Sequence, residues 1–181
     1  MQRRMGEAVA RVARRVNETV ESHGDTLDLA DCKLVSFPAG IYKAVRSVAD
    51  GIRHISLANN ELRALGSRFA TAFSQLQELN LEGNLLHRLP QELGSLLHLR
   101  AVNLARNKFR SFPEALTAAP ALESINLEGN EIADVPTEAL ASMASLRSLN
   151  LRANPVCPAV RLLVRPLVPF ELLLSPEATV P

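Results

Sequence analysis

The sequence predicts an α/β solenoid, in which a short strand and a return segment recur along the chain and stack side by side. The first observation is a framework, L-x-x-L-x-L-x-x-N-x-L, that recurs from Ile52, Leu76, Leu99, Leu122 and Leu146. The second is its constant phase, because the framework asparagines are 24, 23, 23 and 24 residues apart, at Asn60, Asn84, Asn107, Asn130 and Asn154. The third is an aromatic content of only 4%, which suits a core of many small leucine-lined layers.

An earlier copy of the framework, LDLADCKLVSFP, begins at Leu27 and brings the number of repeats to six. It has Gly24 at the first apolar position and Cys32 in the slot that Asn fills elsewhere, 28 residues before the next such slot. We interpret Cys32 as a framework residue rather than a reactive thiol. A disulfide with Cys157 is excluded, because five strand spacings place the first and last coils about 24 Å apart, and a disulfide spans at most ~7 Å.

Each part of the framework has a physical cause. The L-x-L alternation is a short strand with one face turned inward, and its copies pair in parallel along the solenoid. The Asn lies where the chain turns away from the strand, so its amide can satisfy backbone groups that the turn would otherwise leave buried and unpaired. Two of these asparagines follow a glycine, Gly83 or Gly129, which marks a backbone position in the turn rather than a phosphate-binding loop.

The predicted fold class is therefore α/β, a leucine-rich-repeat solenoid (horseshoe). Short parallel strands form its concave face, and short helical, 3₁₀ or extended returns form its convex face. A proline sets φ and blocks helix before it in three returns, so each should hold one or two helical or 3₁₀ turns, after Pro90, Pro113 and Pro136. The second return carries Phe69 and Phe73 without a proline and should be more helical. The first return is the longest and predicts a helix from about Ile41 to Ala49.

We divide the single domain, residues 1–181, into an N-terminal cap helix (1–23), six repeats (24–154) and a C-terminal cap with a tail (155–181). Residues 3–21 carry an apolar stripe at helical spacing, Met5, Val9, Val12, Val16 and Val20. The other faces of this helix carry arginines, Arg3, Arg4, Arg11, Arg14 and Arg15. The pattern favours a cap laid over the first coil. A basic amphipathic helix that docks on a membrane or a partner is the alternative.

The C-terminal segment is apolar but interrupted, by Arg161, Arg165, Glu171 and several prolines. It is therefore not a transmembrane helix, and we expect an irregular cap whose last residues are disordered. The apolar block LVPFELLL exceeds what a cap needs, so a role in partner binding or self-association is a hypothesis.

The sequence carries no constellation typical of an active site. Its four histidines show no ligand spacing, and Walker, G-x-S-x-G, H-E-x-x-H and C-x-x-C motifs are missing. The net charge of +1 provides no overall field for nucleic acid or an anionic membrane. We expect no enzyme, no cofactor, no metal site and no small-molecule substrate, and direct nucleic-acid contact is disfavoured.

The two cysteines and the N-terminal residues bear on location. Extracellular proteins of this architecture carry cysteine clusters in their caps, and this sequence does not. Its first residues also lack the apolar run and cleavage site of a signal peptide. We expect a cytoplasmic or nuclear protein that is neither secreted nor transmembrane.

The concave face is the candidate binding site. The middle residues of L-x-L and the residues before the second framework Leu should form two exposed columns, flanked by charged spacers that alternate in sign. In register, Arg100, Glu123 and Arg147 would form one row, and Glu128 would face Arg152. Such a ladder could neutralise itself or recognise a mixed-charge partner, and few aromatic anchors imply moderate, salt-sensitive binding. The candidate partner-binding residues are Asp28, Arg53, His54, Glu78, Asn80, Glu82, Arg100, Asn103, Arg106, Glu123, Asn126, Glu128, Arg147, Asn150 and Arg152.

Several segments also carry a family resemblance: MGEAVARVARRVNETVES, DTLDLADCKLVSFP, SLANNEL, LEGNLLHRLP and NLEGNEIADVP. The repeats resemble the short 23-residue intracellular class of leucine-rich-repeat proteins, such as the Ras-group and phosphatase-regulatory ones. From Met5 to Ser175 the chain more closely resembles one small vertebrate family of this class. The resemblance implies a small intracellular protein of repeats and caps without an established activity, and it assigns no functional residues.

The sequence predicts a non-enzymatic protein–protein interaction module or scaffold that is monomeric. It does not identify the protein partner. Two alternatives remain open. One is a peripheral membrane adaptor that uses the basic amphipathic helix of residues 3–21, and the other is a nucleoprotein adaptor.

Overall fold

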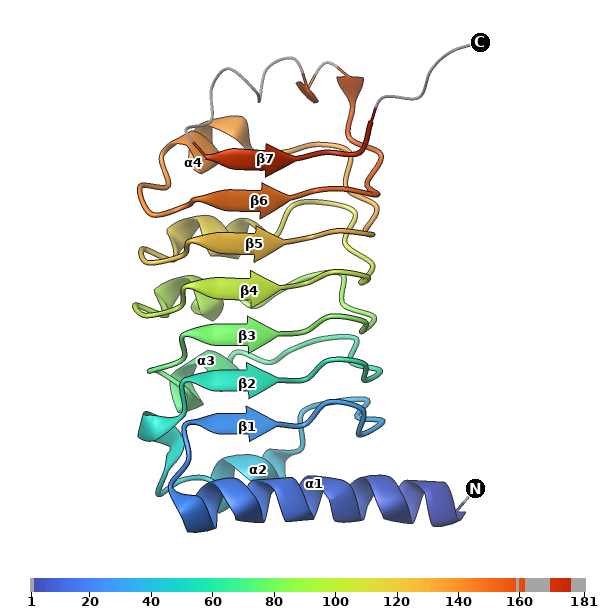
Figure 1. Ribbon diagram of the computed structural model, residues 1–181, viewed down its shortest axis with the longest axis vertical. Helices are drawn as coiled ribbons and strands as arrows, with labels where there is room; N and C mark the ends of the chain where they lie inside the picture. Colours follow the sequence, from blue (N-terminus) through green and yellow to red (C-terminus); the bar gives the residue numbers. More distant parts are fainter. Residues whose placement is uncertain (1, 159, 162–169, 177–181) are drawn as a thin grey trace.

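The computed structural model describes residues 2–158, 160–161 and 170–176, and these form one solenoid (Figure 1). Its concave face is a single parallel sheet whose strands follow one another in chain order. The strands are β1 (Thr26–Asp28), β2 (His54–Ser56), β3 (Glu78–Asn80), β4 (Ala101–Asn103), β5 (Ser124–Asn126), β6 (Ser148–Asn150) and β7 (Glu171–Leu173). The leucine-rich-repeat fold class predicted from the sequence is confirmed.

In β1 to β6 the middle residue points into the core and its two neighbours point outward. Leu27, Ile55 and Leu79 are buried, whereas the residues on either side of each are exposed or half-buried. Equivalent residues pair directly from strand to strand, so that Leu27 lies beside Ile55 and Ile55 beside Leu79. The core is therefore one continuous column of aliphatic layers that runs the length of the solenoid.

The framework asparagines bind each coil to the one before it. The Nδ2 group of Asn107 donates to the carbonyl of Leu81 on the preceding coil at 2.9 Å, and its Oδ1 accepts from the N–H of Leu86 at 3.0 Å. The other framework asparagines repeat this pattern, and all are buried. Cys32 occupies the coil that has no predecessor, so no earlier backbone group needs an amide there. Its thiol donates to the carbonyl of Ala30, and the residue is 2% exposed.

The residue before each framework position has a positive φ. Gly83 and Gly129 adopt φ of 72°, which confirms that these glycines mark a position in the turn. Arg106 and Ala153 adopt the same left-handed conformation, at φ of 54° and 56°, although their side chains make it costly. The turn geometry is therefore imposed by the fold at every coil, whether or not a glycine is present.

The convex face consists of the short returns α2 (Ala39–Ala44), η1 (Ala49–Gly51), α3 (Arg68–Ala72), η2 (Gln91–Ser95), η3 (Glu114–Ala118) and α4 (Thr137–Ala141). The second return was expected to be more helical than the returns that begin with a proline. It contains the α-helix α3, which contrasts with the 3₁₀ turns η2 and η3, but α4 after Pro136 is an α-helix of the same length, five residues. The expected helix from Ile41 to Ala49 is wrong in its bounds, because α2 begins at Ala39 and ends at Ala44. Beyond it the chain continues in three-residue turns, with Val48 N–H donating to Val45 and Gly51 N–H to Val48.

The helix α1 (Gln2–Ser22) lies alongside the first coil, next to β1 (Figure 1). Val16 enters the core, Thr19 Oγ1 donates to the carbonyl of Thr26 at 2.8 Å, and Arg15 donates to the carbonyl of Ala30 at 2.7 Å. Val9 belongs to the same apolar stripe but is 69% exposed, so the first coil covers only part of the stripe. The side chains of Met5, Arg3 and Arg4 lie outside the described part of the structure.

At the other end, the segment expected to be an irregular cap contributes the strand β7. Leu151 N–H donates to the carbonyl of Leu173 at 2.8 Å, and Glu171 N–H donates to the carbonyl of Arg147 at 2.9 Å. The open edge of β6 presents unpaired backbone groups, and the chain returns to satisfy them. Part of the block LVPFELLL and the expected disorder of the last residues, 177–181, lie outside the described residues.

Two findings on the described residues concern membrane crossing and metal binding. No helix among them is both long enough and apolar enough to cross a bilayer. Nor do three or more of their His, Cys, Asp and Glu side chains gather in a group suited to a metal ion.

Candidate functional site

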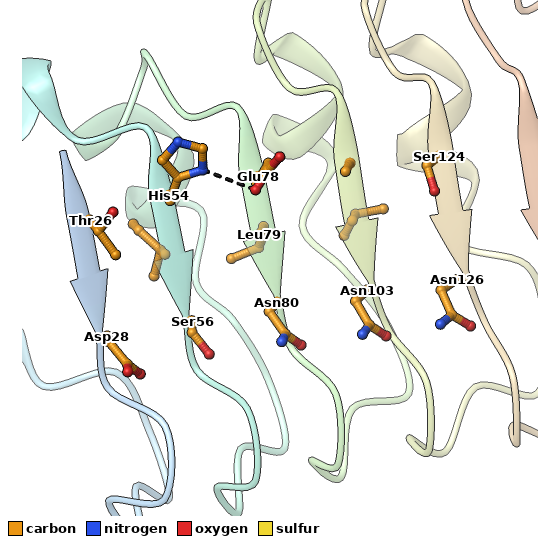
Figure 2. Close-up of a pocket in the computed structure, with 13 residues that line it drawn as sticks. Thr26, Asp28, His54, Ser56, Glu78, Leu79, Asn80, Asn103, Ser124 and Asn126 are labelled. Atoms are coloured by element: carbon orange, nitrogen blue, oxygen red, sulfur yellow. Dashed lines mark hydrogen bonds and ion pairs between the residues drawn. The ribbon is translucent and has the colours of Figure 1, made fainter.

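The strands place two columns of outward-pointing side chains on the concave face (Figure 2). The upper column contains, in order, Thr26, His54, Glu78, Ala101, Ser124 and Ser148. The lower column contains Asp28, Ser56, Asn80, Asn103, Asn126 and Asn150. Between β1 and β5 these side chains line a shallow depression of about 440 Å³, which we call the concave depression.

The lower column has a structural role that the sequence interpretation missed. Asn80, Asn103 and Asn126 each accept a hydrogen bond through Oδ1, at 3.0 Å, from the backbone N–H two residues further on. Asp28 and Asn150 make the same bond in their coils, to the N–H groups of Ala30 and Arg152. The side chain thereby closes the turn at the end of each strand.

This bond fixes which end of each amide points away from the turn. With Oδ1 held by the backbone, the Nδ2 group remains as the outward donor. Within the described residues, the Nδ2 groups of Asn80, Asn103 and Asn126 have no protein acceptor. Adjacent strands lie about 4.8 Å apart, so the concave depression carries a row of preoriented N–H donors at that spacing.

The upper column changes character along the solenoid. His54 Nδ1 lies 3.0 Å from Glu78 Oε2, an interaction that joins β2 to β3 (Figure 2). Beyond Glu78 the column is small and neutral, because Ala101 and Ser124 follow, and Ser148 Oγ lies 3.4 Å from Ser124 Oγ. The upper column is therefore charged at β2 and β3 and neutral from β4 to β6.

The N-terminal end of the face is supported from α1. Arg15 lies 3.7 Å from Asp28 Oδ1, and Arg11 donates to the carbonyl of Asp31. These two arginines were assigned only to a generally basic helix, and the sequence contains no spacing signal that links residue 15 to residue 28. The contact depends on where α1 lies, which is a tertiary feature.

The charged spacers form only part of the expected ladder. Glu123 and Arg147 pair at 3.5 Å, but Arg100 turns away from Glu123 and donates to Gln77 Oε1 at 3.1 Å. The expected row of Arg100, Glu123 and Arg147 is present in the backbone, because Glu123 N–H donates to the carbonyl of Arg100 and Arg147 N–H to that of Glu123, both at 2.8 Å. Its ion pairing stops at Glu123, since Arg100 forms no ion pair among the described residues. Gln77 offers an acceptor on the preceding coil, and a long arginine side chain can reach either neighbour.

The turn after each strand shows a second departure. Arg106 reaches back to Glu82, with Nη2 at 3.4 Å from Oε1, and also donates to Asn59 Oδ1 at 3.3 Å. The expected pair of Glu128 with Arg152 does not occur among the ion pairs of the described residues. Arg53 likewise has no ion pair there, although its backbone carbonyl accepts from Gln77 and Glu78. Exposed pairs of this kind contribute only about 0–1 kcal/mol each.

Known proteins with the same repeat resemble this chain. A profile of the family described as Leucine rich repeat matches residues 50–109 and 98–156. Two curated relatives carry the name Leucine-rich repeat-containing protein 20. The one from Mus musculus is 65% identical over 179 residues, which cover 99% of this chain and 97% of the relative. The one from Homo sapiens is 64% identical over 177 residues, which cover 98% and 96%. These matches confirm the resemblance drawn from the sequence.

Solved structures share the architecture. A leucine-rich-repeat protein of Leptospira interrogans is 28% identical with a TM-score of 0.67, over 77% of this chain and 34% of that one. The leucine-rich repeat domain of the type III effector XopL is 24% identical with a TM-score of 0.71, over 94% of this chain and 58% of that one. The likeness to the effector concerns the fold alone.

Proposed function

The chain belongs to the leucine-rich repeat family, and within it to the group of leucine-rich repeat-containing protein 20; from this premise we propose a non-enzymatic module that binds a protein partner on its concave face. The observation that carries the proposal is the row of amide donors in the concave depression. Asn80, Asn103 and Asn126 are held by their own turns, so binding costs them little rotational freedom. Preoriented donors of this kind fit a partner that presents carbonyl or carboxylate oxygens.

The distribution of charge on the concave face favours one orientation of a bound partner segment. The N-terminal coils carry the acidic side chains Asp25, Asp28 and Asp31, whereas Arg147 and Arg152 lie at the C-terminal end. A partner segment with basic residues toward β1 and acidic residues toward β6 would match this gradient. The remaining candidate residues surround the concave depression, and their charges make partner binding depend on salt concentration.

The test replaces the donors without disturbing the turns. In the double variant Asn103→Asp and Asn126→Asp, a carboxylate oxygen can still accept the backbone N–H, as Asp28 already does at the same position of β1. The outward N–H donors become acceptors, so a partner that offers oxygens should be repelled. The matched control is Gln91→Glu, which makes the same change of amide to carboxylate on the convex face, at the start of η2.

Partners would be captured from cell lysate with the wild-type protein and with both variants, and quantified by mass spectrometry. We expect a set of proteins retained by the wild type and by Gln91→Glu but lost by the double variant. Retention of the same set by all three proteins would refute binding at the amide row. Capture should also weaken as salt is raised, and a flat response between low and high ionic strength would exclude a polar site on this face.

The contacts of α1 support its role as a cap over that of a membrane anchor. Arg11 and Arg15 donate to carbonyl groups of the first coil, so two of the helix cations already serve the solenoid. Deletion of residues 1–22 distinguishes the two roles. A cap predicts loss of cooperative unfolding, whereas an anchor predicts a folded protein that no longer associates with membranes.

The state of the cysteines supports an intracellular location. Cys32 and Cys157 are both free thiols, and burial protects the first of them. Free thiols are typical of reducing compartments. Fluorescence imaging of a tagged protein tests the location, and an accumulation in the secretory pathway would contradict it.

A further inference from the structure

A second hollow lies on the convex face, far from the amide row, between the first and second returns. It has a volume of about 490 Å³ and opens between α2, η1 and α3. Its polar lining comprises Tyr42, Lys43, Arg46, Asp50, Arg68 and Thr71, and we call it the convex pocket. The concave-face proposal uses none of these residues.

The convex pocket carries an excess of positive charge. Lys43, Arg46 and Arg68 contribute three cations against the single carboxylate of Asp50, which leaves a net charge of about +2. None of these four groups takes part in an ion pair within the described residues. Unpaired cations that face one hollow repel one another, and an anion placed among them relieves that repulsion.

One of the cations is held in place by an aromatic ring. The guanidinium carbon of Arg68 lies 4.5 Å from the centroid of the Tyr42 ring, the arrangement of a cation–π contact. Tyr42 itself packs against Phe37, with ring centroids 4.9 Å apart, and against Phe73, at 6.1 Å. Phe69 completes the cluster, so four of the seven aromatic side chains of the protein support this one pocket.

The aromatic cluster makes the pocket a preformed feature. Phe69 and Phe73 are fully buried, so the ring of Tyr42 rests on a fixed support and positions Arg68. Burial raises the pKa of the Tyr42 phenol, against the opposing effect of Arg68, so the hydroxyl keeps its proton and can donate. The Thr71 hydroxyl is a further polar group at the rim.

We propose that the convex pocket binds a phosphate monoester carried on a side chain of a partner protein. A phosphate monoester bears a charge of about −1.5 to −2 at neutral pH, which matches the net charge of the pocket. Its oxygens accept charge-assisted hydrogen bonds, which arginine donates in pairs.

The surroundings of the pocket favour a protein phosphate over a lipid headgroup. A membrane-binding site combines cations with apolar side chains that enter the bilayer interface. The exposed large apolar residues of the described structure are Val9, Val35, Leu85 and Leu97, and none of them lines the convex pocket. The lining offers only alanine beside its polar groups.

The test titrates the full-length protein with short probes and follows it by NMR. The probes are glycine-flanked pentapeptides with a central phosphoserine or phosphotyrosine, and their unphosphorylated counterparts. We expect shifts of the side-chain N–H signals of Arg46 and Arg68 with at least one phosphorylated peptide and none with the unphosphorylated ones. Equal shifts with both forms, or no shift with either phosphopeptide, would overturn the proposal.

Paired variants locate the site. The double variant Arg46→Gln and Arg68→Gln should weaken phosphopeptide binding by at least about tenfold, because it removes two charge-assisted donors. The control pair, Arg63→Gln and Arg88→Gln, removes the same charge from exposed positions outside the pocket and should leave affinity within about twofold. If both pairs of substitutions weakened phosphopeptide binding equally, binding would depend on the net charge of the protein and not on the convex pocket, and the proposal would be overturned.

A vesicle arm separates the two sources of phosphate. Vesicles of phosphatidylcholine with a small fraction of phosphatidylinositol 4-phosphate are compared with the phosphopeptides in a sedimentation assay. We expect no retention on the vesicles that depends on Arg46 and Arg68. Retention that is tighter than phosphopeptide binding and is lost in the double variant would overturn the assignment to a protein partner.

Discussion

Replacement of Asn107 by alanine provides a quantitative test of how the coils are held together. The side chain is 3% exposed and joins two coils, since it donates to the carbonyl of Leu81 at 2.9 Å and accepts from Leu86 N–H at 3.0 Å. In the variant the Leu81 carbonyl keeps the amide of Asn84 at 3.0 Å, so it remains paired. The N–H of Leu86 loses its acceptor inside the core.

The orphaned N–H dominates the expected cost. A buried donor without a partner costs about 1–3 kcal/mol, and the lost hydrogen bonds add about 0.5–1.5 kcal/mol. We therefore expect Asn107→Ala to lower the free energy of unfolding by about 2–4 kcal/mol. Urea denaturation followed by circular dichroism measures it, with the midpoint and slope analysed together to detect a loss of two-state behaviour.

Asn103→Ala is the matched control, because it removes the same side chain four residues earlier on the concave surface. Asn103 makes one bond, to the N–H of Ala105 at 3.0 Å, on a half-buried turn. Its loss should cost about 1 kcal/mol. If Asn107→Ala proved no more destabilising than Asn103→Ala, the framework asparagines would not be the element that joins the coils.

Three further outcomes follow from single positions. Ala153→Gly should raise the free energy of unfolding by about 1 kcal/mol, because it relieves a φ of 56°, and a lower urea midpoint would contradict this. Gly94→Ala should lower it by about 1–3 kcal/mol, because the added Cβ would lie 2.5 Å from a carbonyl oxygen of the next return. Gly66→Ala, which meets nothing within 4 Å, is its control in thermal unfolding. Iodoacetamide at pH 8 should modify Cys32 far more slowly than Cys157, because burial raises the pKa of the Cys32 thiol despite nearby arginines and keeps it protonated. Equal rates in the native protein, measured by mass spectrometry with urea-unfolded protein as the reference, would contradict a buried Cys32.

The repeat itself was predictable because its constraints are local and recur. Each L-x-L must bury alternate side chains, and each framework Asn must satisfy the turn beside it, so spacing alone determines strand positions and parallel register. The left-handed residue before the Asn could be predicted from Gly83 and Gly129 and holds even where Arg106 replaces glycine.

The strand β7 was missed because its segment carries only the L-x-L part of the framework, at Leu172 and Leu174, with Pro169 at the first framework position and Glu177 where the Asn would follow. It forms because the edge of β6 offers unpaired backbone groups, and because Leu172 and Leu174 pack against the end of the core. The bounds of α2 were missed for a related reason, since the chain beyond Ala44 must reach the start of the next coil at Ile52 and does so in tighter turns.

The positions of the candidate-site side chains in two columns were predicted from the sequence, but their hydrogen bonding was not. Asn103 and Asn126 were expected on the concave face, but the sequence interpretation missed that the turns hold their Oδ1 atoms and direct their Nδ2 donors outward. A signal for this exists in the sequence, because Asn and Asp at the end of a strand commonly bind the N–H two residues on. Nothing in the sequence indicated the convex pocket, since Tyr42 of the first return and Phe73 of the second lie 31 residues apart in the chain and meet only in the fold.

The way Asn107 binds its neighbouring coil bears on how such a protein can change its length. The coils repeat at 23 residues in this region, and each framework amide is paired with the coil directly before it. A duplicated copy of residues 99–121, placed after residue 121, would therefore find complementary backbone groups on both sides. It would lengthen the sheet by about 4.8 Å and add one amide to the row on the inner face. Tandem duplication of a single coil is thus a conservative step for this fold. It increases the length of the concave face and the number of amide donors on it together, while both end caps stay unchanged.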